Sequence, residues 1–253
     1  MHLEVLNVAK HFFKGREKIH ALEDVSFHAS EREFISIIGP TGCGKSTLLK
    51  IIAGLERPSR GEVRLRGETV NKPHPKISMV FQSFALFPWR TVLQNVEFGL
   101  ELRGVPKDVR RRIAMEYIEL VGLKGYENCY PKELSGGMRQ RVGLARALAA
   151  EPEVVLLDEA LSALDEFTAQ ILRSDLEEIW KSSRQTFIMV THNLAEAIQL
   201  SDKVVVLSSK PAKVKKIIHI HLKRPRLRSN PNFGKYVREL HRLLKEELEG
   251  VFV

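Results

Sequence analysis

The sequence predicts an α/β fold with a mainly parallel sheet, and three observations support this prediction. Beyond residue 33, short apolar segments of strand length alternate with longer helical segments. One apolar segment leads through a glycine-rich loop into a helical pattern, and another ends in two acidic residues. Continuous apolar strands of this kind are typical of a parallel sheet that is buried on both faces.

The first expected elements surround the glycine-rich loop. Two short strands at residues 3–8 and 23–27 are expected around a polar, lysine-rich turn, which gives an N-terminal antiparallel β region. A buried strand at 34–38 precedes the loop, and a helix at 45–53 follows it until Gly54 ends the helical pattern.

The middle of the chain predicts an inserted helical subdomain at about residues 84–134. Residues 91–121 predict two helices separated near Gly104 and Pro106, and these helices are too long and polar for a simple crossover. The other expected elements are a strand at 77–81, a loop and helix at 131–150, a strand at 154–157, a helix at 166–180, a strand at 186–190, a helix at 194–200, a strand at 203–207 and an amphipathic helix at 233–248.

Composition narrows the class of protein. The 253 residues are enough for one substantial core. Cys43 and Cys129 are too few for a disulfide framework or a multi-cysteine zinc site, so we expect a reducing compartment. We expect no secretion signal, and no apolar run approaches the roughly 20 residues that span a bilayer, so other chains must supply any membrane crossing.

The glycine-rich loop consists of Gly39, Pro40, Thr41, Gly42, Cys43, Gly44, Lys45, Ser46 and Thr47. This spacing between a strand and a helix is that of a phosphate-binding loop. Glycines let backbone amides converge on phosphate oxygens, and the helix N-terminus adds partial positive charge. We therefore expect ATP, with Lys45 on its β- and γ-phosphates and the Ser46 hydroxyl on Mg²⁺. Cys43 is expected to act only as a small residue that fits the loop.

A pair of carboxylates ends the apolar strand at 154–157. Ligands gather at the carboxyl ends of strands in parallel α/β sheets, so we expect Asp158 and Glu159 to face the phosphates. Without a cation, adjacent carboxylates repel each other and one pKa rises. Mg²⁺ beside Asp158 would offset this repulsion and leave Glu159 to polarise the attacking water.

A second glycine motif consists of Leu134, Ser135, Gly136, Gly137, Met138, Arg139 and Gln140. Ser135 is a suitable N-cap, and the two glycines expose amides at the start of a helix. One ATP does not need two anion-binding surfaces from one subunit. We therefore expect this motif to grip the γ-phosphate of ATP bound to a partner, so that ATP joins a dimer.

In their identity and order, these motifs resemble the ATP-binding-cassette ATPases, which are P-loop NTPases, over about residues 1–209. A basic C-terminal extension remains at 210–253. The resemblance implies that Gln82 belongs to the glutamine loop, which touches the metal and the water, and that His192 is the switch histidine at the γ-phosphate. The family's loop that crosses to the partner subunit is matched by Ser162, Ala163, Leu164 and Asp165.

The resemblance also suggests an adenine contact and two departures. Phe12 resembles the aromatic residue that stacks on adenine, and Phe13 competes for this role. Ala160 stands where the family's importers often have Pro, and Asn193 stands where they usually have Asp. Neither change removes a group that touches phosphate. We therefore expect them to affect only the rate of ATP hydrolysis and not the identity of the protein.

Residues 84–96 resemble the importer branch that serves nitrate, sulfonates and taurine. Polyamine, sugar and thiamine-precursor importers share much of this design. The resemblance implies an ATPase that works as a homodimer or pseudo-symmetric dimer at the cytoplasmic face of the cell membrane. Its partners would be transmembrane permease subunits and, indirectly, an extracytoplasmic solute-binding protein.

Two other functions compete with transport. The net charge of +9 permits an ABC-type ATPase that acts on nucleic acid, but the about 90 residues between Lys45 and Ser135 hold no heptads and no paired cysteines. A module that uses ATP only to dimerise would not need Glu159 and His192. The basic extension is either a solvated surface or a docking segment near the membrane. Its basic residues are Lys210, Lys213, Lys215, Lys216, Lys223, Arg224, Arg226 and Arg228.

Overall fold

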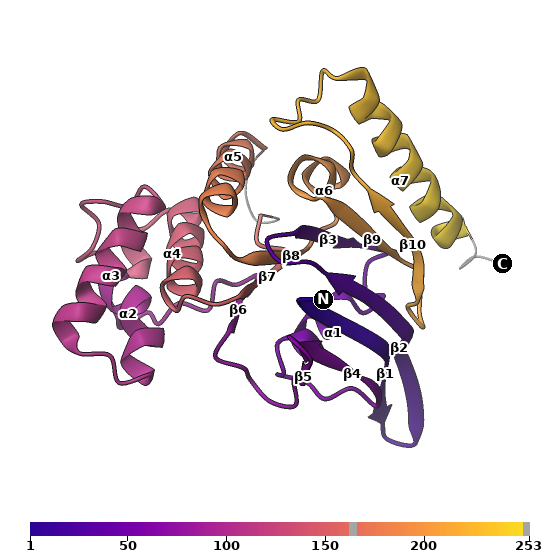
Figure 1. Cartoon of the computed structure of the whole chain (residues 1–253), viewed down its shortest axis with the longest axis horizontal. Helices are drawn as coiled ribbons and strands as arrows, with labels where there is room; N and C mark the ends of the chain where they lie inside the picture. Colours follow the sequence, from indigo (N-terminus) through magenta and orange to yellow (C-terminus); the bar gives the residue numbers. More distant parts are fainter. Residues whose placement is uncertain (162–165, 250–253) are drawn as a thin grey trace. The chain divides into compact units, whose positions relative to one another are not determined.

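The computed structural model describes residues 1–161 and 166–249. The chain divides into two compact units (Figure 1). The first unit joins residues 1–74 to residues 186–253, and the second unit comprises residues 75–185. The glycine-rich loop and His192 belong to the first unit, whereas both acidic residues and the second glycine motif belong to the second.

The first unit begins with an antiparallel sheet in the order β2-β1-β4-β5. Its strands are β1 (Leu3–Lys14), β2 (Glu17–Ala29), β4 (Arg60–Leu65) and β5 (Glu68–Thr69). The predicted antiparallel region is confirmed, but the predicted strands were too short. The lysine-rich segment expected as a turn is mostly paired strand, since Phe13 lies opposite Lys18 and Lys14 lies opposite Glu17. Cross-strand pairing stabilises these polar residues in the ribbon, and their local sequence does not reveal it.

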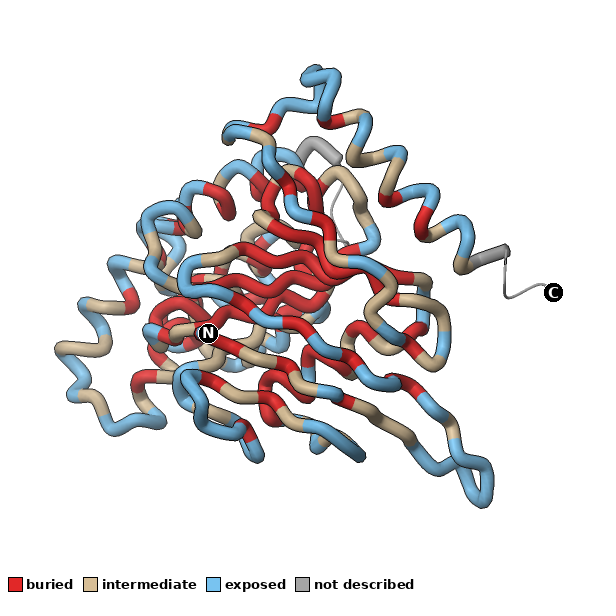
Figure 2. Tube along the Cα trace, turned by 45° about the vertical axis from the view of Figure 1, so that its right-hand side comes forward, coloured by how far each residue is buried: buried red, intermediate tan, exposed pale blue. Residues whose placement is uncertain are grey.

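The same unit contains a second sheet in the order β10-β9-β3-β8. Its strands are β3 (Phe34–Ile38), β8 (Thr186–Val190), β9 (Lys203–Leu207) and β10 (Val214–His219). Strands β8 and β9 run parallel to β3, and every residue of these three strands is buried (Figure 2). The predicted parallel sheet is thus confirmed, and its residues form the core of the unit. The helices of this unit are α1 (Lys45–Ile52), α6 (Leu194–Leu200) and α7 (Pro231–Glu249).

The second unit consists of two parallel strands and the helical subdomain. Its elements are β6 (Ile77–Val80), α2 (Val92–Leu102), α3 (Lys107–Leu120), the 3-10 turn η1 (Pro131–Glu133), α4 (Gly136–Ala149), β7 (Val154–Asp158) and α5 (Glu166–Ser182). The predicted break between two helices near Gly104 and Pro106 is confirmed. Thr91 begins α2 with a capping box to Gln94, which explains why the helix starts there.

None of the helices within the described ranges is long and apolar enough to cross a membrane.

Candidate functional site

The glycine-rich loop connects β3 to α1 in the first unit, as predicted. Gly42 and Gly44 have φ angles of 74° and 124°, a region that side chains disfavour. A Cβ atom on Gly44 would lie 2.9 Å from Cδ2 of Leu22. Gly44 is also the N-cap of α1, and it has no side chain to bond the first amides of the helix. The loop therefore presents backbone amides at a helix N-terminus, the arrangement that binds phosphate.

Lys45 is the first residue of α1, and it is 6% exposed. Its Nζ donates hydrogen bonds to the carbonyl oxygens of Gly39 and Pro40, both at 2.9 Å. The ammonium group is thus held against the loop itself. Cys43 is buried, and burial raises the pKa of its thiol. The thiol therefore stays protonated, in agreement with a packing role for this residue.

Phe12 and Phe13 point to opposite faces of β1, because side chains alternate along a strand. The Nζ of Lys10 lies 5.0 Å from the centre of the Phe12 ring. The same Nζ donates to the carboxylate of Glu56 at 2.6 Å and to the carbonyl of Arg57 at 2.8 Å, just beyond the end of α1. Through Lys10, Phe12 is thus on the same face of β1 as Glu56 and Arg57, which follow the phosphate-loop helix α1. Phe13 packs edge-on against His11 and is 69% exposed.

His192 is exposed just beyond the carboxyl end of β8. Because β8 pairs with β3 in parallel register, His192 and the phosphate loop lie at the same edge of the sheet. Its neighbours Thr191 and Asn193 are both tied to α6. The Thr191 hydroxyl donates to the carboxylate of Glu196 at 2.7 Å, and the Asn193 side chain accepts from the amides of Ala195 and Glu196. Asn193 is therefore an N-cap, a role in which Asn and Asp are interchangeable.

The acidic pair lies at the carboxyl end of β7 in the second unit. Asp158 is 7% exposed, and Glu159 has a φ angle of 47°. A positive φ is uncommon for Glu, and such strained residues cluster at functional sites. The Nε2 atom of Gln82 donates to Oε2 of Glu159 at 3.2 Å. Within this unit the structure therefore brings Gln82, from the end of β6, to the carboxylate that the sequence predicts as the base.

The segment after Gln82 is held by Arg146, which the sequence analysis did not identify. Phe84 and Ala85 have φ angles of 60° and 45°. Arg146, near the end of α4, donates to their carbonyl oxygens at 2.7 and 2.8 Å. The helix that begins with the second glycine motif thus contacts the loop that begins with Gln82. An arginine within a helix carries no local signal of such a contact, so only the fold reveals it.

The second glycine motif opens α4, as predicted. The hydroxyl of Ser135 accepts from the amide of Met138 at 3.2 Å, which confirms the expected N-cap. Ser135 is exposed, whereas Leu134 and Gln140 are buried on either side of the helix start. The helix N-terminus and its two glycines are therefore accessible to an anion. The predicted inter-subunit loop, residues 162–165, lies outside the described residues.

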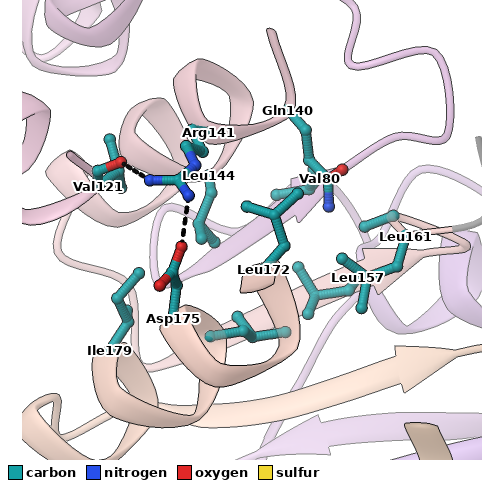
Figure 3. Close-up of a pocket in the computed structure, with 12 residues that line it drawn as sticks. Val80, Val121, Gln140, Arg141, Leu144, Leu157, Leu161, Leu172, Asp175 and Ile179 are labelled. Atoms are coloured by element: carbon teal, nitrogen blue, oxygen red, sulfur yellow. Dashed lines mark hydrogen bonds and ion pairs between the residues drawn. The ribbon is translucent and has the colours of Figure 1, made fainter. Parts of the chain in front are cut away.

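A small cavity lies between α4 and α5 (Figure 3). Its volume of about 20 Å³ has room for roughly one water molecule. Gln140, Arg141 and Leu144 line it from α4, and Leu172 and Asp175 line it from α5. It is too small for a nucleotide, so we interpret it as a packing gap. In its wall, Arg141 and Asp175 form an ion pair at 2.6 Å, and Arg141 also donates to the carbonyl of Val121 at 2.8 Å.

We expect Arg141→Met to lower the free energy of unfolding by about 1–2 kcal/mol, because it leaves a partly buried carboxylate without its ion-pair partner. Chemical denaturation of Arg141→Met, Asp175→Asn and the double variant measures the coupling between the two side chains. The exposed pair Lys124 and Glu119, also 2.6 Å apart, serves as the control and should show no measurable coupling. Equal coupling for both pairs would contradict a structural role for Arg141.

Comparison with known proteins agrees with this geometry. The family model for the ABC transporter matches residues 22–162. An uncharacterized ABC transporter ATP-binding protein of Methanocaldococcus jannaschii is 47% identical over 97% of this chain and 92% of that protein. The aliphatic sulfonates import ATP-binding protein SsuB of Bacillus cereus is 44% identical, over 92% of each chain. The nitrate import ATP-binding protein NrtD of Synechocystis sp. is 39% identical, over 99% of each chain.

A solved structure supports the same assignment. The dimeric, post-hydrolysis state of an ATP-binding cassette with ADP and Pi matches with a TM-score of 0.77 and 33% identity. The match covers 87% of this chain and all of that one. The family model spans more than half of the chain, and the relatives match nearly its whole length. The chain therefore belongs to the ABC transporter family and is an ATP-binding-cassette ATPase.

Proposed function

We propose that this chain is the ATP-hydrolysing subunit of an importer for a small solute such as nitrate, a sulfonate or taurine. The observation that carries the proposal is its likeness to two import ATP-binding proteins, one for aliphatic sulfonates and one for nitrate, over 92% and 99% of its length. The site chemistry fits the same role, since it offers a phosphate loop, a carboxylate base and a second anion-binding helix start.

In this proposal the residues of one chain form only part of each reaction site. The loop from Gly39 to Thr47 binds the phosphates of ATP, and Lys45 neutralises their charge. Glu159 accepts the proton of the attacking water, while Gln82 orients its carboxylate through the hydrogen bond at 3.2 Å. His192 contacts the γ-phosphate. The start of α4 in a second subunit, with Ser135 exposed, completes the site.

Magnesium fits the oxygen donors that this proposal assigns to it. Ser46, Gln82 and Asp158 offer a hydroxyl, an amide oxygen and a carboxylate, which are the hard donors that Mg²⁺ prefers. Among the described residues, no group of three or more His, Cys, Asp or Glu side chains could hold a metal by itself. Such a sparse donor set suits an ion that shares its coordination with ATP phosphates. The ion would supply positive charge against the phosphate oxygens.

The proposed assembly is a dimer of such subunits, identical or pseudo-symmetric, bound to transmembrane permease subunits at the cytoplasmic face of the membrane. Support for the dimer comes from the similar solved cassette, which is dimeric. Support for membrane docking comes from the segment after Gln82, where Trp89 is 71% exposed. Arg90 lies 4.9 Å from the centre of the Phe98 ring, so the segment is anchored on the helical subdomain while Trp89 stays available to a partner.

The proposal is tested by reconstituting the chain in liposomes with its own permease and solute-binding protein. We expect ATP-dependent uptake of labelled taurine, ethanesulfonate or nitrate. Trp89→Ala should lower uptake at least tenfold, and Leu102→Ala, which alters another exposed apolar residue, should not. Uptake of a polyamine, sugar or thiamine precursor instead would indicate another importer branch. ATPase activity stimulated by DNA but not by the membrane subunits would contradict the transport proposal.

A further inference from the structure

The C-terminal extension packs tightly on the rest of the first unit, to which it belongs. Strand β10 pairs with β9, and α7 lies beside α6 (Figure 1). Phe233, Leu240 and Leu243 of α7 are at most 5% exposed. They belong to a cluster with Ile38, Ala197, Ile198, Val204, Val206, Ile218 and Ile220. Helix α6 is therefore covered by α7 of the C-terminal extension.

Two arginines of this extension are bonded to the end of α6. Arg226 is 4% exposed, and its guanidinium donates to the carbonyl oxygens of Ile198, at 2.9 Å, and Ser201. Arg224 donates to the carbonyl oxygen of Leu200 at 2.5 Å. The last carbonyls of a helix have no partner within the helix, and cations favour this end of its dipole. The two arginines thus supply both the donors and the charge that the end of α6 requires.

The same arginines are tied to fixed parts of the unit. Arg226 also donates to the carbonyl oxygens of Leu222, at 2.9 Å, and Ile220, at 3.2 Å. Arg224 donates to the Asp202 carboxylate at 2.6 Å. Asp202 in turn accepts from the amide of Phe34, at the start of β3, at 2.9 Å. The end of α6 is therefore connected to the sheet on which the phosphate loop is built.

The opposite end of α6 carries His192. Thr191 and Asn193, on either side of His192, bond to the first turn of α6 through Glu196 and Ala195. Helix α6 has only seven residues, which is a rod of about 10 Å. A shift or rotation at its last turn must therefore move its first turn as well, together with the residues bonded there.

We propose that Arg226, assisted by Arg224, is a positioning residue for His192 and acts through α6. This inference rests on the role proposed above for His192. Burying a guanidinium is costly, and an apolar side chain would fill the same space without that cost. A fork of hydrogen bonds to carbonyls on both sides of the helix end is suited to holding α6 in one orientation. The C-terminal extension thereby sets the position of the γ-phosphate contact.

The test uses the full chain with Arg226→Lys, which keeps the charge but loses the planar fork, and with Arg224→Gln as a second, milder variant. We expect turnover at saturating ATP to fall about tenfold in Arg226→Lys, with the Kd for ATP changed less than twofold. Lys223→Gln, at an exposed neighbouring position, is the matched control and should match the native chain. In a His192→Ala background, Arg226→Lys should have no further effect on turnover, because both changes act through one group.

A second measurement does not depend on activity. The imidazole resonances of His192, assigned by their loss in His192→Ala, should shift in Arg226→Lys and in Arg224→Gln but not in Lys223→Gln. Unmoved resonances in both arginine variants would overturn the inference, as would an undiminished effect of Arg226→Lys in the His192→Ala background. Native turnover in His192→Ala would refute only the proposed role of His192 at the γ-phosphate. The resonance shifts would still decide whether the two arginines position this side chain.

Discussion

Glu159→Gln is expected to abolish ATP turnover while leaving ATP bound. The amide keeps the size of the side chain and a hydrogen-bond acceptor for Gln82, which lies 3.2 Å from the native carboxylate. It cannot accept a proton from water, so we expect turnover to fall by a factor of roughly 10²–10⁴. Because the other phosphate contacts remain, the variant should accumulate as an ATP-bound dimer. Single-turnover hydrolysis and size-exclusion chromatography with ATP measure both effects.

Glu151→Gln is the matched control for this experiment. Glu151 lies before the same strand, β7, and is exposed. It should hydrolyse ATP like the native chain and should not form a trapped dimer. Turnover at the native rate in Glu159→Gln would show that Glu159 is not the base. A loss of ATP binding in that variant would instead indicate a structural role for its carboxylate.

Lys45→Met is expected to weaken ATP binding itself. Met retains the length and apolar stem of Lys, so the buried position stays filled and the loop keeps its packing. The variant lacks the ammonium group that Gly39 and Pro40 hold at 2.9 Å over the loop. Loss of a charged partner at a phosphate site costs about 2–5 kcal/mol. The Kd for ATP should therefore rise at least thirtyfold, and turnover should become undetectable at millimolar ATP.

Equilibrium dialysis with labelled ATP measures this loss, and thermal unfolding verifies that the variant is folded. Lys50→Met is the control, because Lys50 lies on the same helix and is exposed. The control should bind ATP with native affinity. Native affinity in Lys45→Met would exclude Lys45 from phosphate binding, and the proposed function of the loop would then depend on its backbone amides alone.

The strands of the parallel sheet could be predicted because their short apolar sequences are typical of buried strands. Residues 34–38 and 186–190 are short apolar runs followed by loop residues, and the structure has strands with these bounds. The hairpin of β1 and β2 was predicted too short, since its polar residues are strands only through their cross-strand partners. Strand β10 was missed for a similar reason. Its lysines suggest a solvated segment, but pairing with β9 makes it an edge strand.

The sequence by itself determined where the phosphate loop, the carboxylate pair and the second glycine motif lie in the fold. In each of these, the functional groups are contiguous, and their spacing along the chain sets their geometry. Only the tertiary structure decided the contacts of Arg146, Arg224 and Arg226. Their partners are backbone carbonyls of remote segments, and a carbonyl carries no sequence identity. From the sequence alone, a basic side chain is predicted to be exposed to solvent. The fold changes this prediction where it places backbone carbonyls within hydrogen-bonding distance.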